Sequence, residues 1–269
     1  MTTLDPYRER VEYAPIRFLH RLNPLAKIGA TLPAMGFLLF TRDIVTPLAF
    51  LALALVLLII GAHLPWRLWL ALGLGMPVLV SFMTLSFAIW VDPDKVDRAV
   101  TLLTIGDYRL YLGSVLVGLA TAARLMAILT LGLLAGTTST GPDLVRAMVQ
   151  QLRVPYRIGY TALAAYRFVP RFGHELQVIR SAHRVRGMAG GRGPIAGVRR
   201  YLGYVVPLLA GAIRHAERVA LAMDARAFGA HASRTERHLV PFRSRDWVFM
   251  ALFLAASAAI VLFIERSLP

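Results

Sequence analysis

The chain has 269 residues, of which 57% are hydrophobic and 17% are charged, and its formal net charge is +15. A soluble domain of this size rarely combines so much apolar residue with so little charge. The sequence contains no cysteine, which excludes disulfides and cysteine-ligated metal sites.

A polar N-terminal segment, residues 1–27, precedes the first apolar stretch. It lacks an early apolar core and a cleavage site, so it does not have the pattern of a signal peptide. Four apolar stretches come after it that have the length of membrane spans or pairs of spans: 28–62, 66–90, 110–136 and 246–264.

The first of these stretches is too long for one helix, and Arg42 and Asp43 interrupt it. We therefore predict two helices, 28–41 and 44–62, and five spans in all, four of them within 28–136. The first helix would be only about 21 Å long, so it tilts little, starts earlier or is re-entrant. The predicted fold class is an all-α integral membrane protein with about five transmembrane helices and a cytoplasmic domain of long helices.

Charge is distributed unevenly along the chain. The loop 91–109 leans acidic, whereas residues 140–245 hold 18 arginines and 5 acidic residues. Because arginine-rich segments near span ends stay cytoplasmic, we expect the N-terminus and 137–245 inside and the loop outside. Residues 246–269 then form the last span and an external C-terminus. The aspartates of the loop, which include Asp92, Asp94 and Asp97, are interpreted as part of a solvated loop rather than a cation site.

The arginine-rich segment has helical character. Three helices are predicted in it: 141–152, ended by Pro155; 157–186, with a bend at Pro170; and 197–227, with a kink at Pro207 and a close at Gly229. The stretch GMAGGRGP at 187–194 is predicted to break the chain between the second and third helices.

Two arginines fall at the predicted ends of these helices, Arg186 directly before Gly187 and Arg226 three residues before Gly229. Glycine just past a helix end is a common C-cap, and a cation there gains about 0.3–1 kcal/mol from the helix dipole. That is the simpler explanation of both arginines. The second explanation is a docking tip, because small neighbours leave each end slim enough to enter a groove on another protein: Ala182, Gly187, Ala222, Ala225 and Ala227.

Within the 110–136 span, Ser114, Gly118 and Ala122 recur every four residues. Such a stripe permits close helix approach, either inside the chain or at an interface with a partner subunit. Arg124, near the middle of the same span, has either a structural or a functional role.

No constellation for catalysis or metal binding is found. His174-Glu175 begins like a zinc-protease helix, but Val178 stands where the second histidine is needed. A Gly-rich phosphate loop followed by Lys-Ser/Thr is also absent, so we predict no cofactor, no metal and no ATP hydrolysis by this chain.

Several segments, in order, resemble one known family: HRLNPLAKI at 20–28, TTSTGPDLVRAM at 137–148, LRVP at 152–155, YRFVPRFGHEL at 166–176 and RHAERVALAMDARAFG at 214–229. They are similar to the transmembrane T component of energy-coupling factor transporters, the EcfT/CbiQ family. The family pattern has two Ala-Arg-Gly-like motifs at the ends of two long coupling helices. Here they correspond to Val185-Arg186-Gly187 and Ala225-Arg226-Ala227, each with one small departure.

The resemblance implies a multi-pass scaffold in the cell membrane rather than an enzyme. Such a subunit joins two cytoplasmic ABC-type ATPase subunits to a small integral-membrane substrate-binding component (the S component) in an ATP-driven importer of a vitamin or a transition-metal ion. Arg186 and Arg226 would each dock in one ATPase, and residues 137–245 would be the coupling domain. The sequence does not specify the substrate.

Two other functions stay open. The basic segment suits a membrane-anchored protein that binds anionic lipid or nucleic acid, although sparse aromatic interleaving argues against nucleic acid as a partner. A membrane-embedded enzyme is disfavoured because no acid, base and nucleophile converge.

Overall fold

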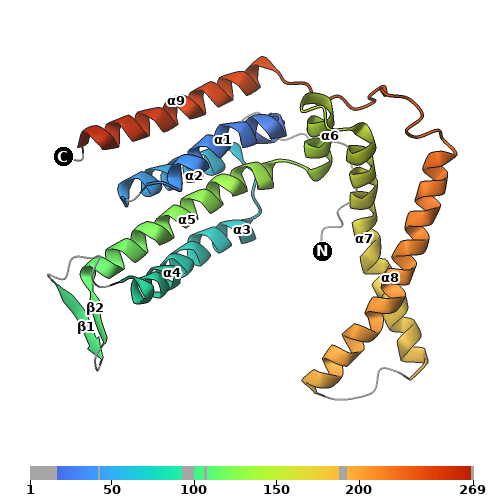
Figure 1. The fold of residues 1–269 in the computed structure, drawn as a ribbon, viewed down its shortest axis with the longest axis horizontal. Coiled ribbons are helices and arrows are strands. Elements are labelled where there is room, and N and C mark those ends of the chain that lie inside the picture. Colours follow the sequence, from blue (N-terminus) through green and yellow to red (C-terminus); the bar gives the residue numbers. More distant parts are fainter. Residues whose placement is uncertain (1–16, 42, 93–99, 106–107, 188–192, 268–269) are drawn as a thin grey trace. The chain divides into compact units, whose positions relative to one another are not determined.

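The computed structural model describes residues 17–41, 43–92, 100–105, 108–187 and 193–267 (Figure 1). Helices dominate these residues, which confirms the predicted all-α class, and one two-stranded sheet accompanies them. In chain order the elements are η1 (Phe18–Arg21), α1 (Pro24–Leu38), α2 (Val45–Gly61), α3 (Trp66–Leu70), the π-helix η2 (Ala71–Gly75), α4 (Met76–Trp90), β1 (Thr101–Ile105), β2 (Tyr108–Tyr111), α5 (Leu112–Thr138), α6 (Gly141–Gln151), α7 (Tyr156–Val185), α8 (Pro194–Asp224) and α9 (Ser244–Ser267).

The chain forms two compact units. The membrane unit combines Glu12–Leu144 with Val240–Pro269, and the arginine-rich unit contains Val145–Leu239. The arginine-rich unit lies within residues 137–245, the segment that its excess of arginine distinguishes from the rest of the sequence.

The membrane unit divides the first apolar stretch into α1 and α2, as the interruption at Arg42 and Asp43 predicts. The first helix begins at Pro24 rather than at residue 28. Asn23 caps it, because its side-chain oxygen accepts a hydrogen bond from the backbone N–H of Leu25 at 2.9 Å. Pro24 takes the first helical position, where its missing N–H costs nothing.

Within the described residues, three helices are long and apolar enough to cross a membrane: Trp66–Trp90, Leu112–Thr138 and Ser244–Arg266. The helix Val45–Gly61 is apolar but shorter, with 17 residues, and α1 has 15. At 1.5 Å per residue these two measure about 26 and 22 Å, less than a hydrocarbon core of about 30 Å. The total of five spans stays a prediction.

A β-hairpin occupies part of the predicted outer loop. Strands β1 and β2 pair antiparallel, with Ile105 opposite Tyr108, and lead directly into α5. The strand sequences TLLTI and YRLY are rich in β-branched and aromatic residues, a local strand signal that the predicted loop overlooked. The predicted solvated aspartates Asp94 and Asp97 lie outside the described residues.

The core of the membrane unit is formed by η1, α1, α2, α5 and α9. Small and branched residues alternate in it, with Ala30 on α1, Leu58 on α2 and Leu131 on α5 all fully buried. These helices pack closely because alanine lets their backbones approach, as is common in membrane interfaces.

A buried polar cluster ties together three helix ends of this unit. The Lys27 side chain is fully buried and donates hydrogen bonds to the backbone oxygens of Leu19 and Thr138 at 3.1 and 3.0 Å and to Thr138 Oγ1 at 3.0 Å. Asp246, 1% exposed at the start of α9, accepts from the backbone N–H groups of Asn23 at 2.8 Å and Arg243 at 2.7 Å. Polar groups buried this deeply are stabilising only when bonded, so the cluster fixes the ends of α1, α5 and α9 together.

The arginine-rich unit consists of most of α6, the long helices α7 and α8, and the segment up to Leu239. Figure 1 shows α7 and α8 crossing, and each is continuous through its proline, Pro170 and Pro207. Little of the unit is buried. Among the described side chains of α8, Tyr204 alone is buried, at 7% exposure.

Candidate functional site: two arginine tips

The first tip ends α7. The helix closes at Val185, and the N–H of Arg186 donates to the oxygen of Ala182 at 3.1 Å. Gly187 comes next with φ +70°, and its N–H donates to the oxygen of Arg184 at 3.1 Å. Glycine adopts this left-handed conformation without a steric penalty, so the predicted glycine C-cap is confirmed. All three motif residues are exposed, Val185 at 89%.

The second tip ends α8, and here the predicted cap is wrong. The helix closes at Asp224 rather than near 227, and Ala227 rather than Gly229 takes the first left-handed position, with φ +55°. Two hydrogen bonds define a Schellman motif: Ala227 N–H to Asp224 O at 2.9 Å and Phe228 N–H to Met223 O at 3.0 Å. An alanine there costs roughly 1–2 kcal/mol more than a glycine would by steric crowding alone.

Contacts with the start of α7 support this second tip. The Phe228 ring lies edge-on to Tyr156, with centroids 5.7 Å apart, and the Arg234 guanidinium lies 5.9 Å from the same Phe228 ring. Arg157 donates a hydrogen bond to the backbone oxygen of Gly229. These contacts hold the chain just beyond the tip, and so they compensate for the strained alanine.

The first tip is supported further back along its helix. Arg180 lies over the rings of Tyr201 and Tyr204, at 5.6 and 5.8 Å, and His183 is edge-on to Tyr204 at 5.2 Å. These contacts fix α7 against α8 before the motif begins.

The two motif arginines, Arg186 and Arg226, both point their functional groups at no partner that the described residues supply. In the part of the chain that the structure describes, no hydrogen bond, ion pair or ring contact involves the side chain of Arg186 or Arg226, and both residues are exposed. A guanidinium group has five N–H donors in a planar fork and suits carboxylates and backbone oxygens of another protein. The described residues include no group of three or more His, Cys, Asp or Glu side chains that could hold a metal ion.

The small-residue stripe of α5 is buried, and at Gly118 it lies against α4. Ser114 is 3% exposed, Ala122 is fully buried, and a Cβ at Gly118 would lie 2.5 Å from the backbone oxygen of Thr84. The stripe therefore allows α4 and α5 to approach closely, and its use by a partner subunit stays a prediction. Arg124 on the same helix interacts electrostatically with Asp43 in the α1–α2 connection.

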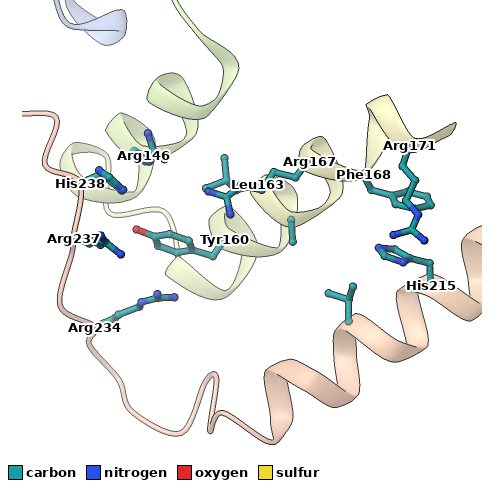
Figure 2. A pocket seen from close by; sticks show the side chains of 12 residues that line it. Arg146, Tyr160, Leu163, Arg167, Phe168, Arg171, His215, Arg234, Arg237 and His238 are labelled. Atoms are coloured by element: carbon teal, nitrogen blue, oxygen red, sulfur yellow. The ribbon is translucent and has the colours of Figure 1, made fainter. Parts of the chain in front are cut away.

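A basic pocket of about 530 Å³, which no sequence pattern indicated, lies in the arginine-rich unit (Figure 2). Its residues are spread from 146 to 238, so no local motif could reveal it. Tyr160 is at its wall: burial, together with the hydrogen bond to Glu236, raises the pKa of this phenol to about 12. Five arginines line it: Arg146, Arg167, Arg171, Arg234 and Arg237.

Known proteins resemble the chain over most of its length. The CbiQ family, described as cobalt transport protein, matches residues 16–237. The energy-coupling factor transporter transmembrane protein EcfT of Bacillus selenitireducens is 27% identical over 252 residues, which cover 90% of this chain and 91% of the relative. EcfT of Streptococcus equi is 27% identical, with 93% of each chain covered.

A longer relative adds a different name. A Bifidobacterium longum protein named "Putative ABC transporter ATP-binding protein" is 27% identical over 253 residues. The alignment covers 90% of this chain but spans only 31% of that protein. With the family match covering well over half of its residues, and with relatives that align end to end, the chain belongs to the EcfT/CbiQ family, the transmembrane components of energy-coupling factor transporters.

Proposed function

We propose that this chain is the coupling scaffold of an ATP-driven importer of a vitamin or a transition-metal ion. It lies in the cell membrane with its N-terminus and arginine-rich unit in the cytoplasm. Two ABC-type ATPase subunits hydrolyse ATP, and the chain transmits their movement to a small membrane-embedded S component. The observation that carries the proposal is the pair of exposed arginines, Arg186 and Arg226, each at the C-terminal tip of a long helix.

The geometry of the tips supports docking into grooves. A tip whose arginine served only the helix dipole would not need small neighbours, yet Gly187, Ala225 and Ala227 surround the two guanidinium groups with little bulk. Contacts hold each helix end, before the α7 tip and beyond the α8 tip, and this suits a transmitter of force, because a docked arginine can move a helix only if the helix end itself does not yield.

An apolar stripe on α8 supports the S component as a partner. Seven large residues of this helix are each more than half exposed and recur at helical spacing: Val198, Tyr201, Leu202, Val205, Val206, Leu209 and Ile213. Exposed apolar surface of this extent is typical of an interaction site. A membrane-embedded partner offers an apolar surface to match it.

The ATPase partners agree with the name of the Bifidobacterium longum relative, in which a region similar to this chain occurs in a longer protein named for ATP binding. Regions that occur together in one protein often correspond to separate subunits that form a stable complex in other organisms. The relative's name therefore supports an ATPase subunit as a partner of this chain.

The test is a pull-down of the tagged chain in mild detergent, from cells of its own organism that also produce the ATPase subunits and the S component. We compare the wild type with the double variant Arg186→Glu plus Arg226→Glu. The matched control is Arg199→Glu plus Arg218→Glu, which makes the same charge change at exposed α8 positions away from both motifs.

Wild type and control are expected to retain two ATPase subunits and one small membrane protein, and the tip variant to lose the ATPases. The identity of the small protein then indicates the substrate. Equal retention by all three forms, or an ATPase lost equally from tip variant and control, would contradict docking through the arginine tips.

A further inference from the structure

The basic pocket of the arginine-rich unit has no role in the proposed coupling. It lies between α6, α7, α8 and the segment that leads to α9, and the side chains labelled in Figure 2 surround it. Its volume of about 530 Å³ is within the usual range for a small-molecule site, about 300–1,000 Å³. Neither Arg186 nor Arg226 lines it.

Two of the arginines of this pocket, Arg167 and Arg237, have no partner among the described residues. Two carboxylates bond to residues of its lining: Glu175 pairs with Arg171, with N and O 3.5 Å apart, and Glu236 accepts a hydrogen bond from Tyr160. Within the described chain, the side chains of Arg167 and Arg237 have no hydrogen bond or ion pair. Like charges gathered in one hollow repel each other unless an anion enters.

Besides Tyr160 and two histidines, His215 and His238, the remaining lining is apolar. Leu163 is 5% exposed, and Phe168 stacks on His215 with centroids 4.2 Å apart. Val219 completes this side of the pocket. An anion with an apolar part next to its charged group therefore matches this lining.

We propose that this pocket binds the phosphate headgroup of an anionic phospholipid. Guanidinium groups bind phosphate oxygens bidentately, and Arg167 on α7 and Arg237 in the segment before α9 are the two lining arginines without a partner among the described residues. In the sequence the lining residues are close to the membrane helices: Arg146 is eight residues after the end of α5, and Arg237 is seven before the start of α9. Basic clusters next to a membrane span are the usual sites of anionic lipid recognition.

The experiment uses the full-length chain purified in mild detergent. Native mass spectrometry and thermal unfolding are recorded with dioleoylphosphatidylglycerol, with dioleoylphosphatidylcholine, and with inorganic phosphate. The pocket variant is Arg167→Gln plus Arg237→Gln, and the matched control is Arg199→Gln plus Arg218→Gln. All four residues are exposed, and neither control position lines the pocket. A third variant, Arg167→Lys plus Arg237→Lys, keeps the charge but loses the planar fork.

We expect phosphatidylglycerol to be retained by the wild type and the control, and the pocket variant to bind it about tenfold more weakly or worse. The lysine variant should fall between them. Equal binding by pocket variant and wild type, an equal loss in pocket variant and control, or tighter retention of phosphatidylcholine would overturn the proposal. So would inorganic phosphate that binds with the same arginine dependence while the lipid adds nothing. The outcome does not depend on ATPase binding, so it is separable from the coupling test.

Discussion

At the end of α7 a glycine takes the left-handed conformation, and at the end of α8 an alanine takes it. The two tips also differ in where their supporting contacts lie. Beyond the α8 tip, Phe228 packs on Tyr156 and Arg157 holds the oxygen of Gly229, whereas the contacts behind the α7 tip end at His183. The backbone turn at the α7 tip therefore depends on its own glycine, Gly187. The turn at the α8 tip depends on contacts with Tyr156 and Arg157, which lie about 70 residues earlier in the chain.

This difference shows that a short motif does not specify its own backbone. The Ala225-Arg226-Ala227 sequence has no glycine, yet Ala227 adopts the left-handed conformation that Gly187 adopts after α7, because aromatic and arginine contacts oppose the strain. Removing the support should therefore affect one tip and leave the other unchanged.

The largest expected effect is on ATPase binding, and it tests whether the two differently supported tips contribute alike. If each tip occupies its own ATPase, the single variants Arg186→Glu and Arg226→Glu should each weaken ATPase binding by about 2–4 kcal/mol, the range of arginine hot spots. The measurement is ATPase retained per scaffold against salt and dilution. A variant that loses nothing would show that its tip is only a helix cap.

Substitution of the aromatic anchor tests the support of the second tip. We expect Phe228→Ala to lower the local stability of residues after α8 by about 1–2 kcal/mol, because it loses packing on Tyr156 and the Arg234 contact. Hydrogen exchange should rise around 225–231 and stay constant around Val185–Gly187. Faster exchange at both tips would refute independent support.

A smaller effect comes from exchanging the cap residues. Gly187→Ala introduces a side chain at φ +70° and should destabilise the α7 tip by about 1 kcal/mol, whereas Ala227→Gly should be neutral or stabilising by up to about 1 kcal/mol. Thermal unfolding of both variants in detergent measures the contrast. Destabilisation by Ala227→Gly would show that the alanine side chain makes a favourable contact.

The smallest effect concerns the proton of Tyr160, next to the supported tip. Because its pKa is raised from the ordinary 10.0 to about 12, its stabilising contribution is complete below pH 10 and disappears as the pH rises to 12. Glu236→Gln should lower this pKa, with the effect of burial remaining. Phenolate absorbance of wild type minus Tyr160→Phe reports the titration, and an unchanged midpoint in Glu236→Gln would argue against the contribution of the carboxylate.

Much of the architecture can be predicted from composition and local pattern. Apolar runs located the membrane helices, the Arg42-Asp43 interruption separated α1 from α2, and Gly187 marked the end of α7, because hydropathy and glycine conformation are local properties. The pairing of β1 with β2 was missed although both strands carry β-branched and aromatic residues, because strands of five and four residues give only a weak signal within a charged loop.

The sequence by itself determined an all-α membrane protein with a basic unit of long helices that end in arginines. Only the tertiary structure decided which residue caps α8, which contacts support that tip, and that arginines between 146 and 237 share one pocket. These features depend on contacts between residues about 70 to 90 positions apart, such as Arg157 with Gly229 and Gln150 with His238. Local propensity carries no information about such pairs, because they exist only after α7 and α8 have crossed.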